Sequence, residues 1–324
     1  MQPIMLTSTL DASEQPIIFI APSGDGAVPL LVRLHTWSAD VTQENAIDEL
    51  AAQRGWAVVR PNARGSNRTP EACASGLAIG DVLDAVEYAR ANANVDPRRI
   101  YLYGASGGGH MALMMACAAP KLWAGVSAWV PVTDLARWFA HSDSVGARYA
   151  KDIVACCGGK PGESPEIDEQ YRLRSPLLHL HRATGVAIDI NAGIRDGHPG
   201  GGSVPIEHTL RAFNELAAAN GRPGKRLTEA QIEACTRTAQ VPEELQAEAV
   251  RDRVYGERRV FLRRTAGPAR VTIFDGGHEE IPGAGIAWLE KHVRRQPAPH
   301  VYPKAAACAW ALLPTAGAAA ATAH

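Results

Sequence analysis

The sequence predicts an α/β fold, a doubly wound and mainly parallel sheet of about eight strands flanked by helices. Apolar runs of strand length alternate along the chain with stretches of helical periodicity. The runs, such as Pro29-Leu-Leu-Val-Arg-Leu-His35, are nearly continuous, which is typical of strands that are buried on both faces. The composition, with 46% hydrophobic and 21% charged residues, suits a globule with a sizeable core.

The expected elements follow one another along the chain. We expect strands at 16–21, 29–35, 56–60, 99–103, 124–130, 185–191 and 269–274, and helices at 42–54, 80–92, 111–117, 206–220 and 284–294. Residues 131–182 are predicted to be irregular, and residues 221–264 a mostly helical insert with a capping box at Thr228-Glu-Ala-Gln231. These patterns indicate a single domain over residues 1–300, in which the segments 131–182 and 221–264 are cap-like insertions that roof a pocket.

Charge, termini and cysteines exclude several classes of function. The formal net charge is -1, so no basic excess indicates nucleic acid. The first residues lack the regions of a signal peptide, so we expect a cytoplasmic protein, although a secreted form without its signal would look the same. The Ala-rich tail, residues 301–324, is too weakly apolar for a membrane span and is expected to be disordered or loosely docked.

The six cysteines permit disulfides without implying them, and neither they nor the histidines show metal-ligand spacing.

The segment Gly104-Ala-Ser-Gly-Gly108 fits the motif G-x-S-x-G in the context that this motif requires. A short apolar strand precedes it and a helix-like segment, Met111–Cys117, follows it. In such a sharp turn the side chains two residues before and after the serine would collide, so both positions need glycine. We therefore interpret Ser106 as a nucleophile whose Oγ stands clear of the sheet.

The order of such hydrolase sites is nucleophile, acid, histidine. His278 follows the last expected strand on a Gly-Gly turn, where it could take the proton of Ser106 and return it to the leaving group. Asp196, on the loop after strand 185–191, is the preferred acid, since its carboxylate would bind Nδ1–H of His278.

Three other aspartates are weaker candidates for the acid. Asp189 falls in the middle of a strand, Asp134 follows the strand after Ser106, and Asp275 is more typical of a turn residue.

An oxyanion hole needs two N–H donors directed at the developing negative charge. We assign one to Gly107, directly after the nucleophile, and the other to Trp37, with Thr36 as the alternative. The ring of Trp37 is expected to line the substrate pocket. Trp138 is a further pocket candidate. Arg64 could bind a substrate carboxylate or brace its loop, and we favour the brace.

Five motifs together resemble a known family. They are Asp96-Pro-Arg-Arg-Ile100, Gly104-Ala-Ser-Gly-Gly108, Tyr171-Arg-Leu-Arg-Ser-Pro176, Arg195-Asp196 with Val204-Pro205, and Gly276-Gly-His278. Over about residues 28–294 the chain is similar to the catalytic domain of prolyl oligopeptidase-type serine hydrolases. The resemblance implies the α/β-hydrolase fold, the triad Ser106, Asp196 and His278, no metal and no cofactor. Members of the family include peptidases and carboxylesterases, among them acetyl and feruloyl esterases.

The chain departs from the family pattern at several points. His35-Thr-Trp-Ser38 stands where His-Gly-Gly-Pro is common, and Gly108-Gly-His110 replaces Gly-Gly-Tyr. An aromatic residue after the first loop position is more typical of cutinase-type and polyester-cleaving esterases. The insert 221–264 widens the gap between acid and histidine. We also expect no β-propeller domain, because the chain is too short for one, and this weakens the peptidase interpretation.

The leading hypothesis is a serine esterase that acts on small or medium acyl esters, with saccharide esters among the candidate substrates. The first alternative is a small aminopeptidase or dipeptidyl peptidase, for which Glu279-Glu280 is the candidate ammonium clamp. A non-catalytic binding protein is the second alternative, and such proteins usually lack a triad member. A homo-oligomer is compatible with the sequence.

Overall fold

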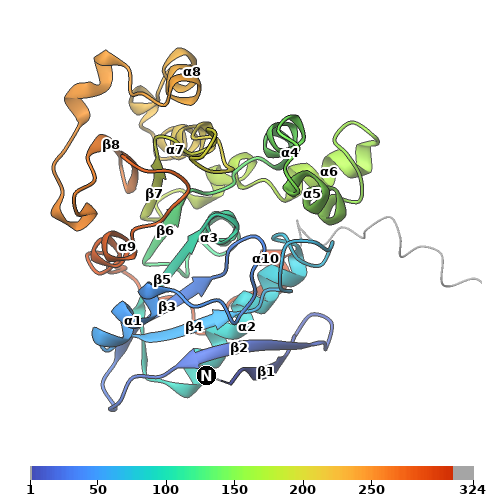
Figure 1. Ribbon diagram of the computed structural model, residues 1–324. Coiled ribbons are helices and arrows are strands. Elements are labelled where there is room, and N and C mark those ends of the chain that lie inside the picture. The colour runs from blue at the N-terminus through green and yellow to red at the C-terminus, as the bar shows by residue number, and fades with distance from the viewer. Residues whose placement is uncertain (1, 309–324) are drawn as a thin grey trace, which may run out of the picture.

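The structure is a computed structural model that describes residues 2–308 of the 324-residue chain. Within these residues a nine-stranded sheet has the order β1-β2-β4-β3-β5-β6-β7-β9-β8 (Figure 1). The strands are β1 (Ile4–Thr7), β2 (Glu14–Ile20), β3 (Val28–Leu34), β4 (Ala57–Pro61), β5 (Val95–Ala105), β6 (Gly125–Trp129), β7 (Ile188–Gly193), β8 (Val260–Ala266) and β9 (Ala269–Phe274).

The central strands β4, β3, β5, β6, β7 and β9 run parallel to one another. The antiparallel pairs lie toward the sheet edges, where β1 pairs with β2, β2 with β4, and β8 with β9. The doubly wound, mainly parallel sheet that the sequence predicts is therefore confirmed. The paired strands β3 and β5 end at nearly the same height in the sheet, and so do the paired strands β7 and β9. The loops that follow these strands therefore lie at one edge of the sheet.

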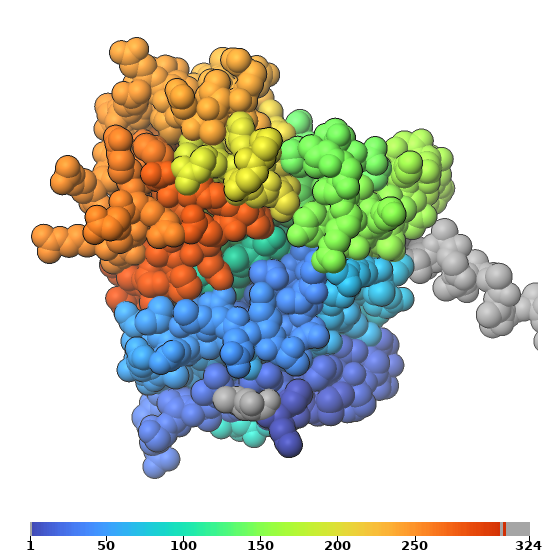
Figure 2. Space-filling view, viewed as in Figure 1, coloured from blue at the N-terminus to red at the C-terminus, as the bar shows by residue number. Residues whose placement is uncertain are grey.

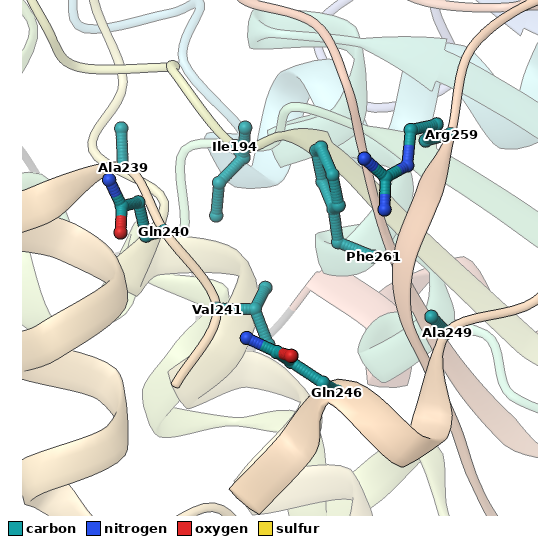
Figure 3. A pocket seen from close by; sticks show the side chains of 8 residues that line it. All are labelled: Ile194, Ala239, Gln240, Val241, Gln246, Ala249, Arg259 and Phe261. Atoms are coloured by element: carbon teal, nitrogen blue, oxygen red, sulfur yellow. The ribbon is translucent and has the colours of Figure 1, made fainter. Parts of the chain in front are cut away.

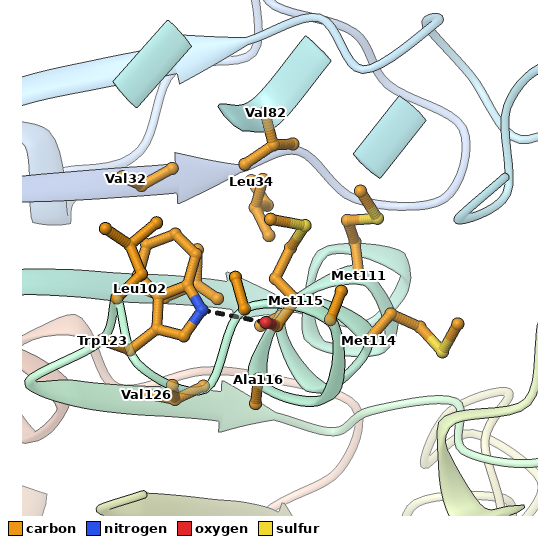
Figure 4. Close-up of a cluster of buried hydrophobic side chains, with 14 of the residues drawn as sticks. Val32, Leu34, Val82, Leu102, Met111, Met114, Met115, Ala116, Trp123 and Val126 are labelled. Carbon is orange, nitrogen blue, oxygen red and sulfur yellow. Dashed lines mark hydrogen bonds between the residues drawn. The ribbon is translucent and has the colours of Figure 1, made fainter. Parts of the chain in front are cut away.

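Helices cover both faces of the sheet, which explains the continuous apolar strands. The helices nearest the strands are α1 (Ala46–Gln53), α2 (Gly76–Asn92), α3 (Gly107–Ala118), α7 (Glu207–Ala219) and α9 (Pro282–Leu289). Val32 of β3 and Leu102 of β5 pack with α2 and α3 on one face (Figure 4). Leu31 and Tyr101, one residue earlier in each strand, belong to the opposite cluster with α1 and α9. Successive strand residues thus point to opposite, equally buried faces.

The segment 131–182 is not irregular as the sequence predicts. It contains α4 (Leu135–Ser144), α5 (Tyr149–Cys157) and α6 (Pro165–Leu173). Asp134 and Ser164 cap α4 and α6 by accepting a hydrogen bond from a backbone N–H of the first turn, and α5 ends at Gly158 in the left-handed conformation. The three short helices bury their apolar sides in a separate cluster around Trp138. Because they pack against one another and not on the main sheet, the segment lacks a long run of helical periodicity in its sequence.

The segment 221–264 is only partly helical, contrary to the prediction. It contains α8 (Glu229–Thr238), and the predicted capping box of Thr228 and Gln231 is present. The segment then makes short turns and enters β8, which extends the sheet by antiparallel pairing with β9. In Figure 2 this orange segment and the green segment 131–182 cover the upper part of the visible face, above the blue N-terminal strands.

The beginning of the tail is docked onto the domain. The short helix α10 (Lys304–Cys308) contacts α2, and Nζ of Lys304 lies 2.5 Å from carboxylate oxygens of both Asp84 and Glu87. The Cys308 side chain is buried beside them. The rest of the predicted tail, 309–324, lies outside the described residues. Among the helices of residues 2–308, none has the length and apolar character needed to cross a membrane.

Candidate active site

Ser106 occupies a strained turn between β5 and α3. Its backbone has φ 56° and ψ -118°, in a region that residues with a side chain rarely adopt. A Cβ added to Gly104 would lie 2.3 Å from the carbonyl oxygen of Gly108, and one on Gly108 would lie 2.6 Å from the carbonyl oxygen of Leu34. The collisions expected at both glycines of the motif are therefore confirmed, and they explain why the turn needs glycine there.

Ser106, His278 and Asp196 lie in a hydrogen-bonded chain. Oγ of Ser106 is 2.8 Å from Nε2 of His278, and Nδ1 of the same ring is 2.8 Å from Oδ2 of Asp196. The Asp196 side chain is 1% exposed and the His278 side chain 21% exposed, so a molecule from solvent can reach the imidazole but not the carboxylate. The structure thus brings together the three residues that sequence order selects.

A glycine-rich loop, residues 197–205, wraps closely around the acid and the histidine. A Cβ on Gly202 would lie 2.3 Å from both Oδ1 of Asp196 and Cβ of His278. The backbone N–H of His278 donates to the carbonyl of Gly201 at 2.6 Å, and the N–H of Val204 donates to Oδ1 of Asp196 at 3.1 Å. Burial raises the pKa of Asp196, while its hydrogen bond with His278 and the hydrogen bonds from Val204 and Gly197 oppose that rise.

The three alternative acids are bound elsewhere. Asp134 caps α4 and pairs with Arg137, and the buried Asp189 binds Arg270 at 2.7 Å. Asp275 forms an ion pair with an arginine at the surface. None of the three forms a hydrogen bond or ion pair with His278 within the described part of the chain.

The backbone N–H groups of Gly107 and Trp37 are the candidate donors of an oxyanion hole beside Ser106. Gly107 packs against the backbone of Trp37, since a Cβ on this glycine would lie 2.5 Å from both N and Cα of Trp37. Neither N–H donates to a protein acceptor among residues 2–308. The alternative donor, the N–H of Thr36, is occupied by a 2.8 Å hydrogen bond to Oε1 of Gln43. The geometry therefore favours Trp37 over Thr36.

The two tryptophan rings expected in the substrate pocket are buried. The residues Trp37 and Trp138 are 2% and 0% exposed, and their rings meet edge to face with centroids 4.6 Å apart. The indole N–H of Trp138 donates to the carbonyl of Ser203 at 2.8 Å. Both rings are enclosed by the helices of segment 131–182, which the sequence did not reveal, and a role of these rings in a substrate pocket stays a prediction.

Arg64 is placed as a brace. Its guanidinium binds Asp81 at 2.6 Å and Asp11 at 2.7 Å, and the hydroxyl of Ser8 at 3.0 Å. The two carboxylates raise the pKa of Arg64 against the opposing effect of burial. These contacts tie the loop after β4 to α2 and engage the guanidinium on both carboxylates.

The structure adds residues near the site that the sequence did not indicate. Arg148, directly before α5, donates a 2.5 Å hydrogen bond to Oγ of Ser38, the residue after Trp37. The hydrogen bond from Trp138 to Ser203 likewise joins segments 65 residues apart. Long-range contacts of this kind carry no local sequence signal.

A separate hollow of about 370 Å³ lies between the turn after α8 and β8 (Figure 3). Its lining residues are Ile194, Ala239, Gln240, Val241, Gln246, Ala249, Arg259 and Phe261. Neither Ser106 nor His278 lines it. No group of three or more histidine, cysteine, aspartate or glutamate side chains within residues 2–308 is arranged to hold a metal ion, and the six cysteines are free thiols.

Comparison with known proteins gives a family match over more than half of the chain. The model of the prolyl oligopeptidase family matches residues 45–233. This range includes the serine and the acid of the hydrogen-bonded chain and ends before the histidine.

Solved structures share the fold at low identity. Acylaminoacyl peptidase of Pyrococcus horikoshii is 20% identical over 69% of this chain, with a TM-score of 0.54. A puromycin-hydrolyzing peptidase of Mycobacterium tuberculosis is 18% identical over 67% of it, and a puromycin hydrolase 21% identical over 67%, each with a TM-score of 0.53. This chain covers 36%, 34% and 33% of those three chains.

Proposed function

Because the chain belongs to the prolyl oligopeptidase family of serine hydrolases, we propose that it hydrolyses acyl bonds with Ser106, His278 and Asp196 as its catalytic triad. The observation that carries the proposal is the continuous chain of 2.8 Å contacts from Oγ of Ser106 through both ring nitrogens of His278 to Asp196. The arrangement matches the general requirement for a nucleophile, a base within hydrogen-bond reach of it, and a group that orients the base.

The reaction has two halves. As Oγ of Ser106 bonds to the carbonyl carbon, its proton passes to Nε2 of His278, which then gives that proton to the departing oxygen or nitrogen as the acyl bond breaks. A water molecule, deprotonated by the same nitrogen, then attacks the acyl-enzyme. The bond between the acyl carbon and Oγ of Ser106 breaks, the proton returns to Oγ, and the carboxylic acid leaves. Asp196 holds the Nδ1–H tautomer and stabilises the imidazolium in both halves.

The N–H groups of Gly107 and Trp37 form the oxyanion hole in this proposal. Both belong to rigid backbone, one at the start of α3 and one in the loop after β3, so little reorganisation accompanies the development of charge. The positive end of α3 lies behind the same oxygen.

We propose carboxylic esters of small or medium acyl groups, saccharide esters among them, as the preferred substrates. An aminopeptidase would need free carboxylates for the substrate ammonium, and the two candidates are already bound. Glu280 accepts hydrogen bonds from Asn45 at 2.5 Å and from the hydroxyl of Tyr103 at 2.7 Å. Glu279 pairs with Arg258 at 2.5 Å.

A peptidase that acts on acylated peptides is the second candidate. The similar solved structures are named as an acylaminoacyl peptidase and puromycin hydrolases. An acylated amino terminus carries no charge, so such a substrate does not require the acidic clamp that Glu279 and Glu280 fail to supply. Ester and amide cleavage would use the same triad.

The deciding experiment compares wild type with Ser106→Ala on four chromogenic substrates. These are p-nitrophenyl acetate, a longer acyl p-nitrophenyl ester, an aminoacyl p-nitroanilide and its N-acetylated form. We expect ester turnover that Ser106→Ala abolishes, with little cleavage of either anilide. Cleavage of the N-acetylated anilide at a rate that matches the esters would establish the second candidate. Ester turnover that survives in Ser106→Ala would overturn the triad.

A further inference from the structure

We infer that Arg148 forms a subsite for a carboxylate of the substrate, beside the oxyanion hole; the inference rests on the proposed function. Arg148 is exposed and lies directly before α5. One guanidinium nitrogen donates a 2.5 Å hydrogen bond to Oγ of Ser38. Ser38 follows Trp37 in the chain, and Trp37 supplies one of the two proposed oxyanion donors.

Aromatic contacts hold the Arg148 side chain near this loop. Its guanidinium lies 5.7 Å from the ring centroid of Tyr149. The Tyr149 ring is 5.0 Å from that of Trp138, which in turn meets Trp37 edge to face. The guanidinium is thus joined to the oxyanion loop twice, by the hydroxyl of Ser38 and by a series of packed rings. Such a constrained side chain loses less entropy when it binds a ligand than a free surface arginine does.

The charge of Arg148 has no carboxylate partner among the described residues. Other arginines around the site are paired, Arg137 with Asp134 at 3.3 Å and Arg68 with Asp152 at 3.5 Å. A guanidinium has five N–H donors in a planar fork, and the contact with Ser38 uses one nitrogen. The remaining donors suit the two oxygens of a carboxylate.

The position of the guanidinium indicates where the carboxylate sits in the substrate. Gly107 touches the backbone of Trp37, and Ser38 is the next residue, about 3.8 Å further along the chain. In Figure 2 the green segment that carries α4 and α5 meets the blue segment after β3 on the visible face. We therefore infer a substrate class of esters or amides that carry a carboxylate a few bonds from the scissile carbonyl.

The test uses two pairs of esters that differ in one charge. Mono-p-nitrophenyl glutarate and p-nitrophenyl valerate carry the difference on the acyl side; 4-acetoxybenzoate and its methyl ester carry it on the leaving side. We expect wild type to prefer the charged member of at least one pair by about tenfold in kcat/KM, the effect of a partly exposed charge-assisted bond. Arg148→Gln should abolish that preference, and Arg148→Lys should keep part of it.

Arg172→Gln is the matched control. Arg172 is an exposed arginine of α6 in the same segment, paired with Glu169 at 2.5 Å, so its replacement makes the same change in net charge. It should leave the ratio within each pair unchanged. Added salt should reduce the wild-type preference, because the contact lies near solvent.

Two results would overturn the subsite while the proposed function stands. One is ester turnover by wild type with no preference for either carboxylate ester. The other is a preference that persists in Arg148→Gln or disappears equally in Arg172→Gln. Wild type that turns over neither the esters nor the anilides would instead overturn the proposed function, and the subsite with it.

Discussion

The indole N–H of Trp138 donates a 2.8 Å hydrogen bond to the carbonyl oxygen of Ser203, and this contact fixes one side of the peptide group that binds the acid of the site. The same peptide group supplies the N–H of Val204, which donates to Oδ1 of Asp196. A helix of segment 131–182 therefore orients the carboxylate through one peptide plane. Trp138 acts here as a positioning residue, since it touches none of Ser106, His278 or Asp196 through a hydrogen bond in the described structure.

We predict that Trp138→Phe lowers kcat about tenfold with little change in KM. The phenyl ring keeps most of the packing but leaves the partly buried carbonyl of Ser203 without its donor, at a cost of about 1 kcal/mol. The peptide plane can then rotate, and Asp196 is held less firmly. Steady-state kinetics on p-nitrophenyl acetate and urea unfolding measure the two effects separately.

Trp123→Phe is the control for this prediction. Trp123 is also fully buried, and its indole N–H donates to the carbonyl of Met115 at 2.9 Å, in the core between α3 and the sheet (Figure 4). It should lose some stability with kcat unchanged, although the carbonyl of Met115 keeps a second hydrogen bond, from the N–H of Ala119 at 2.9 Å. An equal fall of kcat in both variants would mean that Trp138 acts through general stability alone.

The second prediction concerns the acid of the triad. Asp196→Asn keeps the shape of the side chain but loses the acceptor that stabilises the imidazolium and fixes its tautomer, so kcat should fall about 10³–10⁴-fold. Asp134→Asn and Asp275→Asn should leave kcat within about twofold of wild type, as is usual for changes away from the chemistry. A large loss in Asp134→Asn with Asp196→Asn active would transfer the role to Asp134.

The sequence predicted the reactive centre better than its surroundings, for physical reasons. Ser106, Asp196 and His278 each follow a parallel strand, and strand order alone brings such loops together at one sheet edge. The glycines around Ser106 are required because a side chain at either position would collide with nearby backbone, and the motif shows this requirement in the sequence itself. By contrast, the enclosure of Trp37 depends on helices α4 and α5, whose apolar sides face one another and not the sheet.

The third prediction follows from the raised pKa of Asp196. Because burial raises this pKa above its ordinary value of 3.8, the folded state binds the proton more tightly than the unfolded state does. This contribution makes the folded state less stable as pH rises from 3.8 toward the raised pKa, and the loss persists above it. Asp196→Asn has no carboxyl group to titrate at this position. The Tm of the variant minus that of wild type should therefore increase as pH rises from 3.8 to the raised pKa. A Tm difference independent of pH would contradict the argument.

The fourth prediction tests the oxyanion hole. In Gly107→Ala the new Cβ would meet N and Cα of Trp37 at 2.5 Å, so the two N–H donors must move apart. We expect kcat to fall about 10²-fold or more, the usual effect of losing one donor, with KM little affected. Gly283→Ala, where an added Cβ has open space, should retain wild-type kinetics. Full activity in Gly107→Ala would remove Trp37 from the assignment.

The fifth prediction separates the two roles considered for Arg64. Arg64→Gln leaves the carboxylate of Asp81, 3% exposed, without its partner, and breaking a buried pair in this way costs about 3–5 kcal/mol. Unfolding in urea should show that loss, whereas kcat/KM per folded molecule should stay near wild type. The double variant Arg64→Gln, Asp81→Asn should recover part of the stability, because no charge is then buried alone. A fall of kcat/KM at unchanged stability would instead assign Arg64 to a substrate carboxylate.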